Sequence, residues 1–239
     1  MEQYPAAILA GGLATRLHPI TGKIPKALVE VGGQPFIAHQ LCLLRHHGFT
    51  RVVVCAWHLG EMIRDVVGNG ERFGLQVDYV FDGEQPLGTA GAIRRALPTL
   101  GDTFFVLYGD SYLPCDYTAV QASFEEQGKT GLMTVYRNNG QWDMSNIEFR
   151  DGRILAYDKK KRTPCMEHID YGLGVFRQSA FMGLPEGKSA DLEEIYRNLL
   201  GCGELAAQEI TTRFYEIGSF EGLKELDGLL TEDAGRFLV

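Results

Sequence analysis

Residues 6–26 read AAILAGGLATRLHPITGKIPK, and this stretch decides the fold. The run Ala6-Ala7-Ile8-Leu9 is typical of a short buried strand, and two glycines follow within the next three residues. Glycines let backbone N–H groups approach a phosphate closely, and Arg16 and Lys26 add two cations to the stretch. The sequence therefore predicts a phosphate-binding loop after the first strand. The alternative is a tight turn whose two basic residues face solvent.

Two common phosphate motifs do not fit this chain. The loop after Leu9 does not supply the Gly-x-Gly-x-x-Gly pattern of dinucleotide-binding folds. Gly128-Lys129-Thr130 ends like a P-loop, but Ser123 stands where the first glycine of that motif belongs. We therefore expect residues 128–130 to form an ordinary turn.

Predicted strands and helices alternate along the first half of the chain. Hydrophobic patterning predicts strands at 6–9, 51–55, 75–80 and 103–108, and helices at 35–47, 59–67 and 88–97. This alternation is typical of βαβ units and a mainly parallel sheet. Ligands of such sheets bind beyond the carboxyl ends of the strands, so the loops after Leu9, Val80 and Tyr108 should converge on one rim.

The second half of the chain is richer in strands. Strand-like segments occur at 132–137, 146–149, 153–157, 169–176 and 213–217, and helical ones at 191–200 and 220–230. Arg150-Asp151-Gly152 is a strong hairpin signal. No linker rich in proline or serine separates the halves, so we expect the second half to continue the same α/β sheet and to add a closing helix.

Composition excludes several classes of function. Apolar residues make up 45% and charged residues 23% of the 239, as in ordinary globular proteins. The net charge of −8 argues against broad electrostatic binding of nucleic acid. No apolar run approaches ~18 residues, which predicts no membrane span. The five cysteines form no Cys-x-x-Cys pair, and the N-terminus lacks the basic region of a secretory signal, so we expect reduced thiols and a cytoplasmic location.

Five motifs, in order, resemble those of the sugar-1-phosphate nucleotidylyltransferases. Residues 9–26 resemble the family signature Gly-Gly-x-Gly-Thr-Arg-Leu, followed by Pro and then Pro-Lys. Residues 84–91, EQPLGTAG, resemble its second nucleotide loop, and Gly109-Asp110 resembles its metal-binding Gly-Asp. Residues 147–149 together with Lys160 are similar to its sugar-phosphate pocket, and residues 215–219, YEIGS, to its late Asp-x-Gly-Thr element.

This resemblance implies a fold and a division of roles. The fold would be a Rossmann-like three-layer α/β/α arrangement of the nucleotide-diphospho-sugar transferase type, with a mainly parallel mixed sheet. Residues 1–239 would form a single domain, with a nucleotide-binding lobe at 1–130 and a β-rich sugar-phosphate lobe and closing helix at 131–239. The implied site residues are Arg16 and Lys26 for catalysis; Ala10, Gly11, Gly12, Glu84, Gly88 and Thr89 for the nucleotide; Asn146, Glu148, Lys160 and Gly172 for the sugar phosphate; and Asp110 and Glu216 for Mg²⁺.

The chain departs from the family pattern at two positions. Ala14 replaces the usual glycine, which alanine can replace without strain only where φ is negative. Glu216 replaces the usual aspartate and adds one methylene where Mg²⁺ demands regular geometry. The choice of Lys160 depends on an alignment that can slip by one residue to Lys159. Asp170, which precedes Tyr171-Gly172, is a candidate supporting group beside the sugar contacts.

The implied reaction is Mg²⁺-dependent transfer of a nucleoside monophosphate from an NTP to a sugar 1-phosphate, with release of pyrophosphate. Length and the EQPLGTAG loop look most like the heptose-1-phosphate guanylyltransferases, which favours GTP and D-glycero-D-manno-heptose 1-phosphate. A UTP-dependent enzyme for MurNAc 1-phosphate or another hexose 1-phosphate is the alternative. A non-catalytic nucleotide-sugar-binding regulatory subunit, or transfer to choline or glycerol phosphate, also stays open. The sequence does not distinguish a monomer from a homodimer.

Overall fold

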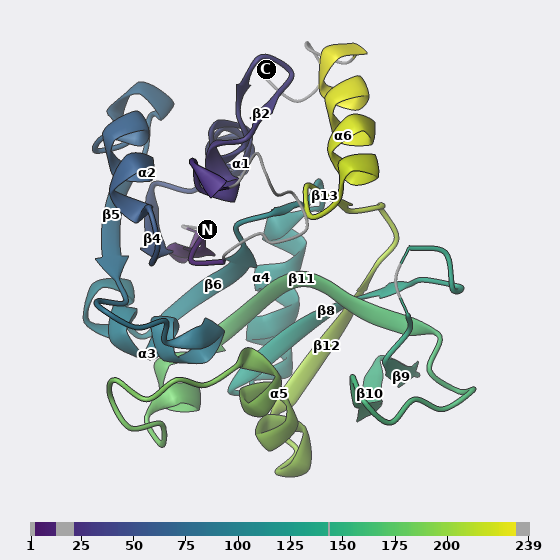
Figure 1. Ribbon diagram of the computed structural model, residues 1–239. Helices are drawn as coiled ribbons and strands as arrows, with labels where there is room; N and C mark the ends of the chain where they lie inside the picture. Colours follow the sequence, from purple (N-terminus) through teal and green to yellow (C-terminus); the bar gives the residue numbers. More distant parts are fainter. Residues whose placement is uncertain (1–2, 13–21, 143, 233–239) are drawn as a thin grey trace.

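A mixed sheet runs through both halves of the chain in the computed structural model, which describes residues 3–12, 22–142 and 144–232 (Figure 1). The sheet order is β10-β9-β11-β6-β1-β4-β5, and β8 pairs with both β11 and β12. Its strands are β1 Ala6–Leu9, β4 Arg51–Ala56, β5 Gln76–Phe81, β6 Thr103–Tyr108, β8 Gly131–Arg137, β9 Ile147–Arg150, β10 Arg153–Tyr157, β11 His168–Arg177 and β12 Leu205–Ile210.

The first half of the sheet is parallel and the second half is mixed. β1 pairs in parallel with β4 and β6, and β4 pairs in parallel with β5. β11 then lies antiparallel to β6 on one side and to β8 on the other, while β12 runs parallel to β8. Two short ribbons add β2 Glu30–Val31 with β3 Gln34–Pro35, and β7 Ser111–Tyr112 with β13 Tyr215–Glu216.

Helices cover both faces of the sheet, which makes three layers (Figure 1). Ala6 and Ile8 belong to one hydrophobic core, Ala7 belongs to the other, and all three are fully buried. Alternate side chains of a strand point to opposite faces, so a strand covered on both sides reads as an unbroken apolar run. The helices are α1 Phe36–His46, α2 Gly60–Val67, α3 Gly88–Leu100, α4 Tyr117–Gln127, α5 Leu192–Gly201 and α6 Phe220–Glu232.

This architecture confirms the predicted Rossmann-like three-layer α/β/α fold with a mixed sheet. β1, β6 and β10 have the bounds expected from the sequence, and the other expected strands of the large sheet differ at their ends by one residue. Helix α3 continues three residues beyond its expected end, past Pro98. The sequence analysis did not anticipate β12, whose residues LAAQEI lack the β-branched and aromatic pattern of a strand. Pairing along β8 stabilises it as a strand.

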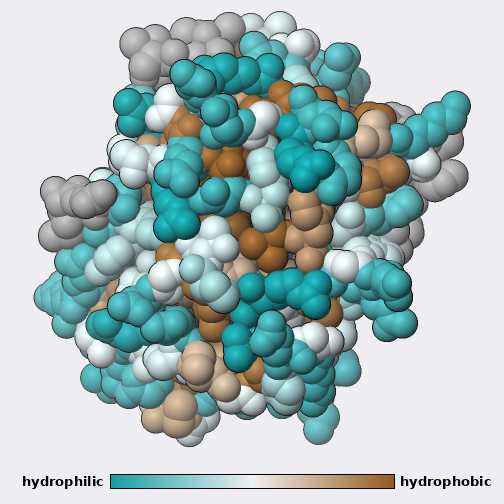
Figure 2. Space-filling model, turned by 90° about the vertical axis from the view of Figure 1, so that its left-hand side faces the viewer, coloured by the Kyte–Doolittle hydropathy of each residue, from teal (hydrophilic) through white to brown (hydrophobic). Residues whose placement is uncertain are grey.

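The surface is largely hydrophilic on the side that carries α2 and the edge strand β5. In Figure 2, apolar residues show in the middle of this face, and hydrophilic residues surround them. Tyr79 and Phe81 of β5 are partly buried against the core and stack on one another. Within the described ranges, no helix has the length and apolar character needed to cross a bilayer.

Candidate active site

Loops that follow three parallel strands meet around one cavity, as the sequence predicts. This first cavity has a volume of about 240 Å³. Its walls include the residues directly after β1, β5 and β6, with contributions from Lys26 and the start of α3. Its lining residues are Leu9, Ala10, Gly11, Gly12, Lys26, Ala27, Cys55, Asp82, Pro86, Gly88, Thr89, Ala92, Tyr108, Gly109, Asp110 and Asp191.

The backbone at the end of β1 is hydrogen-bonded to the residue after β6 on one side and to β4 on the other. The Gly109 N–H donates to the Leu9 carbonyl at 2.9 Å, and the Ala10 N–H donates to the Cys55 carbonyl at 2.8 Å. A Cβ atom on Gly109 would lie only 2.7 Å from the Leu9 oxygen. Glycine is therefore required before Asp110 because the two strand ends leave no room for a side chain.

The loop between β5 and α3 is fixed by its own polar contacts. The Leu87 N–H donates to the Asp82 carboxylate at 2.8 Å, and burial raises the pKa of Asp82. Gly88 has φ +69°, and a Cβ there would lie 2.6 Å from the Ala190 oxygen. The loop thus packs against residues 188–191, and this close approach explains its glycines.

Of the three nucleotide-binding residues predicted in this loop, two line the first cavity and one does not. Gly88 and Thr89 line the first cavity, whereas Glu84 is exposed and is not among its lining residues. The Thr89 hydroxyl accepts a hydrogen bond from Leu192 N–H at 2.7 Å and donates to Asp191. Thr89 therefore connects the first turns of α3 and α5. Ala10, Gly11 and Gly12 also line the first cavity.

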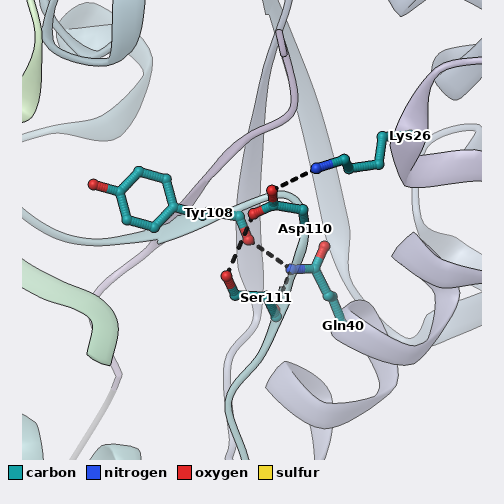
Figure 3. Close-up of polar contacts among 5 residues, drawn as sticks. All are labelled: Lys26, Gln40, Tyr108, Asp110 and Ser111. Atoms are coloured by element: carbon teal, nitrogen blue, oxygen red, sulfur yellow. Dashed lines mark hydrogen bonds and ion pairs between the residues drawn. The ribbon is translucent and has the colours of Figure 1, made fainter. Parts of the chain in front are cut away.

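Lys26 and Asp110, which both line the first cavity, form an ion pair. Lys26 Nζ lies 2.8 Å from Asp110 Oδ2, and Figure 3 shows the two side chains pointing toward one another. The Gln40 amide donates to the Tyr108 and Ser111 carbonyls, both at 2.9 Å, which holds the backbone on either side of Asp110. The Tyr108 ring points away from Lys26 (Figure 3).

A second cavity of about 580 Å³ adjoins the first and shares Tyr108 and Asp110 with it. Three further predicted residues, Asn146, Gly172 and Glu216, line it. Two others, Glu148 and Lys160, are not among its lining residues. Glu148 lies 3.7 Å from Arg150 in a weak ion pair, and the backbone N–H of Lys160 donates to Asp158. The cation that reaches the second cavity from residues 159–162 is Lys159.

Asp110 and Glu216 provide oxygen ligands that suit Mg²⁺. β7 pairs with β13, with Ser111 opposite Glu216, and the Ile217 N–H donates to the Asp110 carbonyl at 2.9 Å. Both carboxylate residues line the second cavity. Mg²⁺ is usually held by one or two carboxylates together with phosphate oxygens and water, so this donor set fits the ion. Within the part of the chain that the structure describes, no group of three or more metal-binding side chains occurs.

The second cavity also contains the carboxylate of Asp170, which accepts the Gly172 N–H at 2.9 Å. Burial raises the pKa of Asp170 to about 6, against opposing effects of that hydrogen bond and the Lys159 ammonium. Its position two residues before the Gly172 contact is the sequence signal that marked it as a supporting group.

The second cavity is also lined by an arginine that stacks on two aromatic rings, a contact that the sequence did not predict. The Arg213 guanidinium lies 3.3 Å from the centre of the Trp142 ring and 4.8 Å from that of Tyr215. It also forms an ion pair with Glu225 of α6. Trp142 and Arg213 are 71 positions apart, so no local pattern relates them. The guanidinium already fills the aromatic and acidic surroundings that would suit a ligand cation.

Arg16 and Ala14, which the sequence analysis singled out, lie outside the described residues. Of the described site residues predicted from the sequence, Glu84, Glu148 and Lys160 line neither cavity, and the others divide between the two. Lys26, the glycine loop and the start of α3 surround the first, and Asn146, Gly172 and Glu216 line the second. Asp110 belongs to both and marks the point where ligands in the two cavities would meet.

Comparison with known proteins places the chain within one family. Residues 5–226 match the family model described as "Nucleotidyl transferase". The N-acetylmuramate alpha-1-phosphate uridylyltransferase of Neisseria meningitidis serogroup B is 31% identical, over 94% of this chain and 97% of its own length. A mannose-1-phosphate guanylyltransferase of Mycobacterium tuberculosis is 27% identical over 85% of this chain, which spans 57% of that protein. A Bacillus anthracis structure in complex with a sucrose superposes with TM-score 0.86 at 21% identity, covering 98% of each chain.

Proposed function

Because the chain belongs to the nucleotidyl transferase family and is a sugar-1-phosphate nucleotidyltransferase, we propose that its two cavities hold the two substrates of that reaction. The first cavity takes the NTP and the second takes the sugar 1-phosphate. The observation that carries this assignment is their junction at Asp110, beside the Lys26 ammonium. An α-phosphate from the first cavity and a sugar phosphate from the second meet there.

The reaction on this arrangement is an in-line displacement. A phosphate oxygen of the sugar phosphate attacks the α-phosphorus of the NTP, and the bond to the bridging oxygen of pyrophosphate breaks. The attacking oxygen is already ionised, so no serine, cysteine or histidine is needed to activate it. Catalysis then consists of bringing two anions together and neutralising their charge.

The chain's own residues supply this neutralisation. Lys26 provides a cation at the junction, and Gly11 and Gly12 line the first cavity, where their backbone N–H groups would bind phosphate oxygens. Arg16, which lies outside the described residues, is proposed from the motif resemblance to stabilise the triphosphate and the leaving pyrophosphate. Asp110 and Glu216 would hold Mg²⁺, which when bound neutralises phosphate charge and orients the phosphates.

We propose that residues lining the second cavity bind the sugar phosphate. Lys159 lines it and is the lysine that we propose binds the phosphate, in place of Lys160. The Asn146 Oδ1 atom is buried with no hydrogen-bond partner among the described residues, and Asn146 lines the cavity. A sugar hydroxyl is a suitable donor to it. We also propose a division into a nucleotide lobe at 1–130 and a sugar lobe at 131–239, with Asp191 crossing to the first cavity and Tyr108, Asp110 and Ser111 to the second.

GTP with D-glycero-D-manno-heptose 1-phosphate is the substrate pair that we propose to test first. The motif resemblance supports this pair, and the mannose-1-phosphate guanylyltransferase shows that guanylyl transfer occurs among the relatives. UTP with MurNAc 1-phosphate is the second candidate, because the Neisseria uridylyltransferase aligns over nearly its whole length. Transfer to choline phosphate is not favoured, since Arg213 already fills the aromatic surroundings that a choline cation would need.

The test is release of pyrophosphate from each of the NTPs against a panel of sugar 1-phosphates, with Mg²⁺ present. We expect turnover with at least one pair and loss of turnover when Mg²⁺ is chelated. Absence of turnover with every pair, in protein that still binds nucleotide, would reject the catalytic proposal. That result would favour the non-catalytic regulatory subunit.

A further inference from the structure

The first cavity extends away from Lys26 and Asp110 to a second end beside β5. In the order β6-β1-β4-β5, the strand before Asp82 lies three positions from the strand before Asp110. Neighbouring strands are roughly 4.8 Å apart, so these two strand ends are separated by on the order of 14 Å. An NTP whose phosphates lie at the junction therefore places its base toward Asp82.

Asp82 is a buried residue at this end of the cavity, and one of its carboxylate oxygens accepts no hydrogen bond from the described residues. It is 7% exposed and lines the cavity. Its Oδ2 atom accepts the Leu87 N–H at 2.8 Å, and among the described residues no donor lies on Oδ1. Burial raises the pKa of Asp82, and two neighbours oppose that shift: the Leu87 N–H and the Arg95 guanidinium, which donates to the Phe81 and Asp82 carbonyls. Because Asp82 lines the cavity and its Oδ1 atom has no donor from the described residues, that atom can accept a hydrogen bond from a ligand in the cavity.

A second carboxylate, that of Asp191, lines the same cavity from the start of α5. Its Oδ1 atom accepts the Thr89 hydroxyl at 3.4 Å. Asp82 accepts the Leu87 N–H and Asp191 accepts the Thr89 hydroxyl, so the two carboxylates are bonded to the residues on either side of Gly88. The base end of the cavity thus has two anionic acceptors.

We propose that Asp82 recognises the nucleobase and that it selects guanine, an inference that rests on the function proposed above. Guanine presents N1–H and a 2-amino group side by side, and adjacent donors suit a carboxylate. Uracil and thymine present one N–H between two carbonyl oxygens, which a carboxylate repels. Adenine and cytosine present one amino group next to a ring nitrogen acceptor. Asp191 adds a second acceptor that favours the same base.

The first measurement is calorimetric binding of each NTP to the whole chain with Mg²⁺, without a sugar phosphate. GTP should bind about tenfold or more tightly than UTP or dTTP, the scale of one charge-assisted hydrogen bond. Inosine triphosphate, which lacks the 2-amino group, should fall between them. Binding does not require turnover, so the result separates base recognition from catalysis.

The decisive variant is Asp82→Asn. The Leu87 N–H would keep the amide oxygen as its acceptor, which leaves the amide NH₂ toward the cavity. GTP affinity should fall about tenfold or more, and xanthosine triphosphate should bind more tightly than GTP, because xanthine has a carbonyl where guanine has its amino group. A purely structural role for Asp82 would weaken both nucleotides equally.

Asp78→Asn is the matched control, because Asp78 lies on the same strand and pairs with Arg51 outside both cavities. It should leave all nucleotide affinities unchanged. If Asp82→Asn does not fold, Asp191→Asn replaces it and should weaken GTP while sparing UTP. Equal binding of UTP and GTP by the unmodified protein, or no gain for xanthosine triphosphate in a folded Asp82→Asn, overturns the inference. Failure to bind any NTP would instead reject the proposed function itself.

Discussion

Lys26 Nζ and Asp110 Oδ2, which lie 84 positions apart in the sequence, are 2.8 Å apart at the junction of the two cavities. Their side chains are 17% and 35% exposed, so water still reaches the pair. A partly solvated ion pair adds little to stability. Its position is the informative feature, because the junction needs both a cation for phosphate and a carboxylate for a metal ion.

Lys26→Ala and Asp110→Ala should each reduce turnover about a hundredfold or more, the scale of one lost transition-state contact. Each should change the free energy of unfolding by less than about 1 kcal/mol, because the pair is partly exposed. Steady-state pyrophosphate release and urea unfolding measure the two effects. Turnover close to that of the unmodified protein in either variant would contradict the assigned site.

Asp170 should make the stability of the protein depend on pH. The pKa of Asp170 rises from 3.8 to about 6 on folding, so the folded state holds this proton more tightly than the unfolded state. The stability that protonation provides is complete below about pH 4 and is lost as pH rises through about 6. Over this range the charged carboxylate should cost up to about 3 kcal/mol, because each tenfold difference in proton affinity between the two states is worth about 1.4 kcal/mol.

The variant Asp170→Asn isolates that contribution. Its amide oxygen can still accept the Gly172 N–H, but the side chain does not ionise. Urea unfolding of both proteins at pH 4, 5, 6 and 7 should show the variant gaining stability relative to the unmodified chain as pH rises. A stability difference that is constant over this range would show that Asp170 does not titrate as described.

Gly88 is expected to tolerate no side chain. Alanine at φ +69° is strained, and its Cβ would lie 2.6 Å from the Ala190 oxygen, a backbone atom that cannot rotate away. Gly88→Ala should therefore destabilise the protein by about 1–3 kcal/mol and weaken NTP binding, as urea unfolding and calorimetry would show. Gly183→Ala is the control, since that glycine has open space around it and no positive φ. Equal stability of the two variants would contradict the close contact.

The sequence was sufficient for the layers of the fold and the meeting of the loops, because both depend on local patterns. The apolar run before the glycines, and the strand that ends at Gly109-Asp110, determine which loops share a rim. Contacts between segments far apart in the sequence could not be predicted, because no local pattern relates their residues. Asp82 is separated from Asp191 by more than a hundred positions, and Trp142 from Arg213 by 71, so only the folded chain shows that they line common walls.

The lysine run at 159–161 allows a direct test of which side chain binds the sugar phosphate. Lys159 lines the second cavity, whereas Lys160 does not. Lys159→Ala should therefore raise KM for the sugar 1-phosphate about tenfold or more with KM for the NTP unchanged, because it removes one charge-assisted phosphate contact. Lys160→Ala should have a much smaller effect, and Lys161→Ala serves as the surface-charge control. Steady-state kinetics with each substrate varied in turn measures both KM values, and a larger effect at Lys160 would restore the assignment made from the motif alignment.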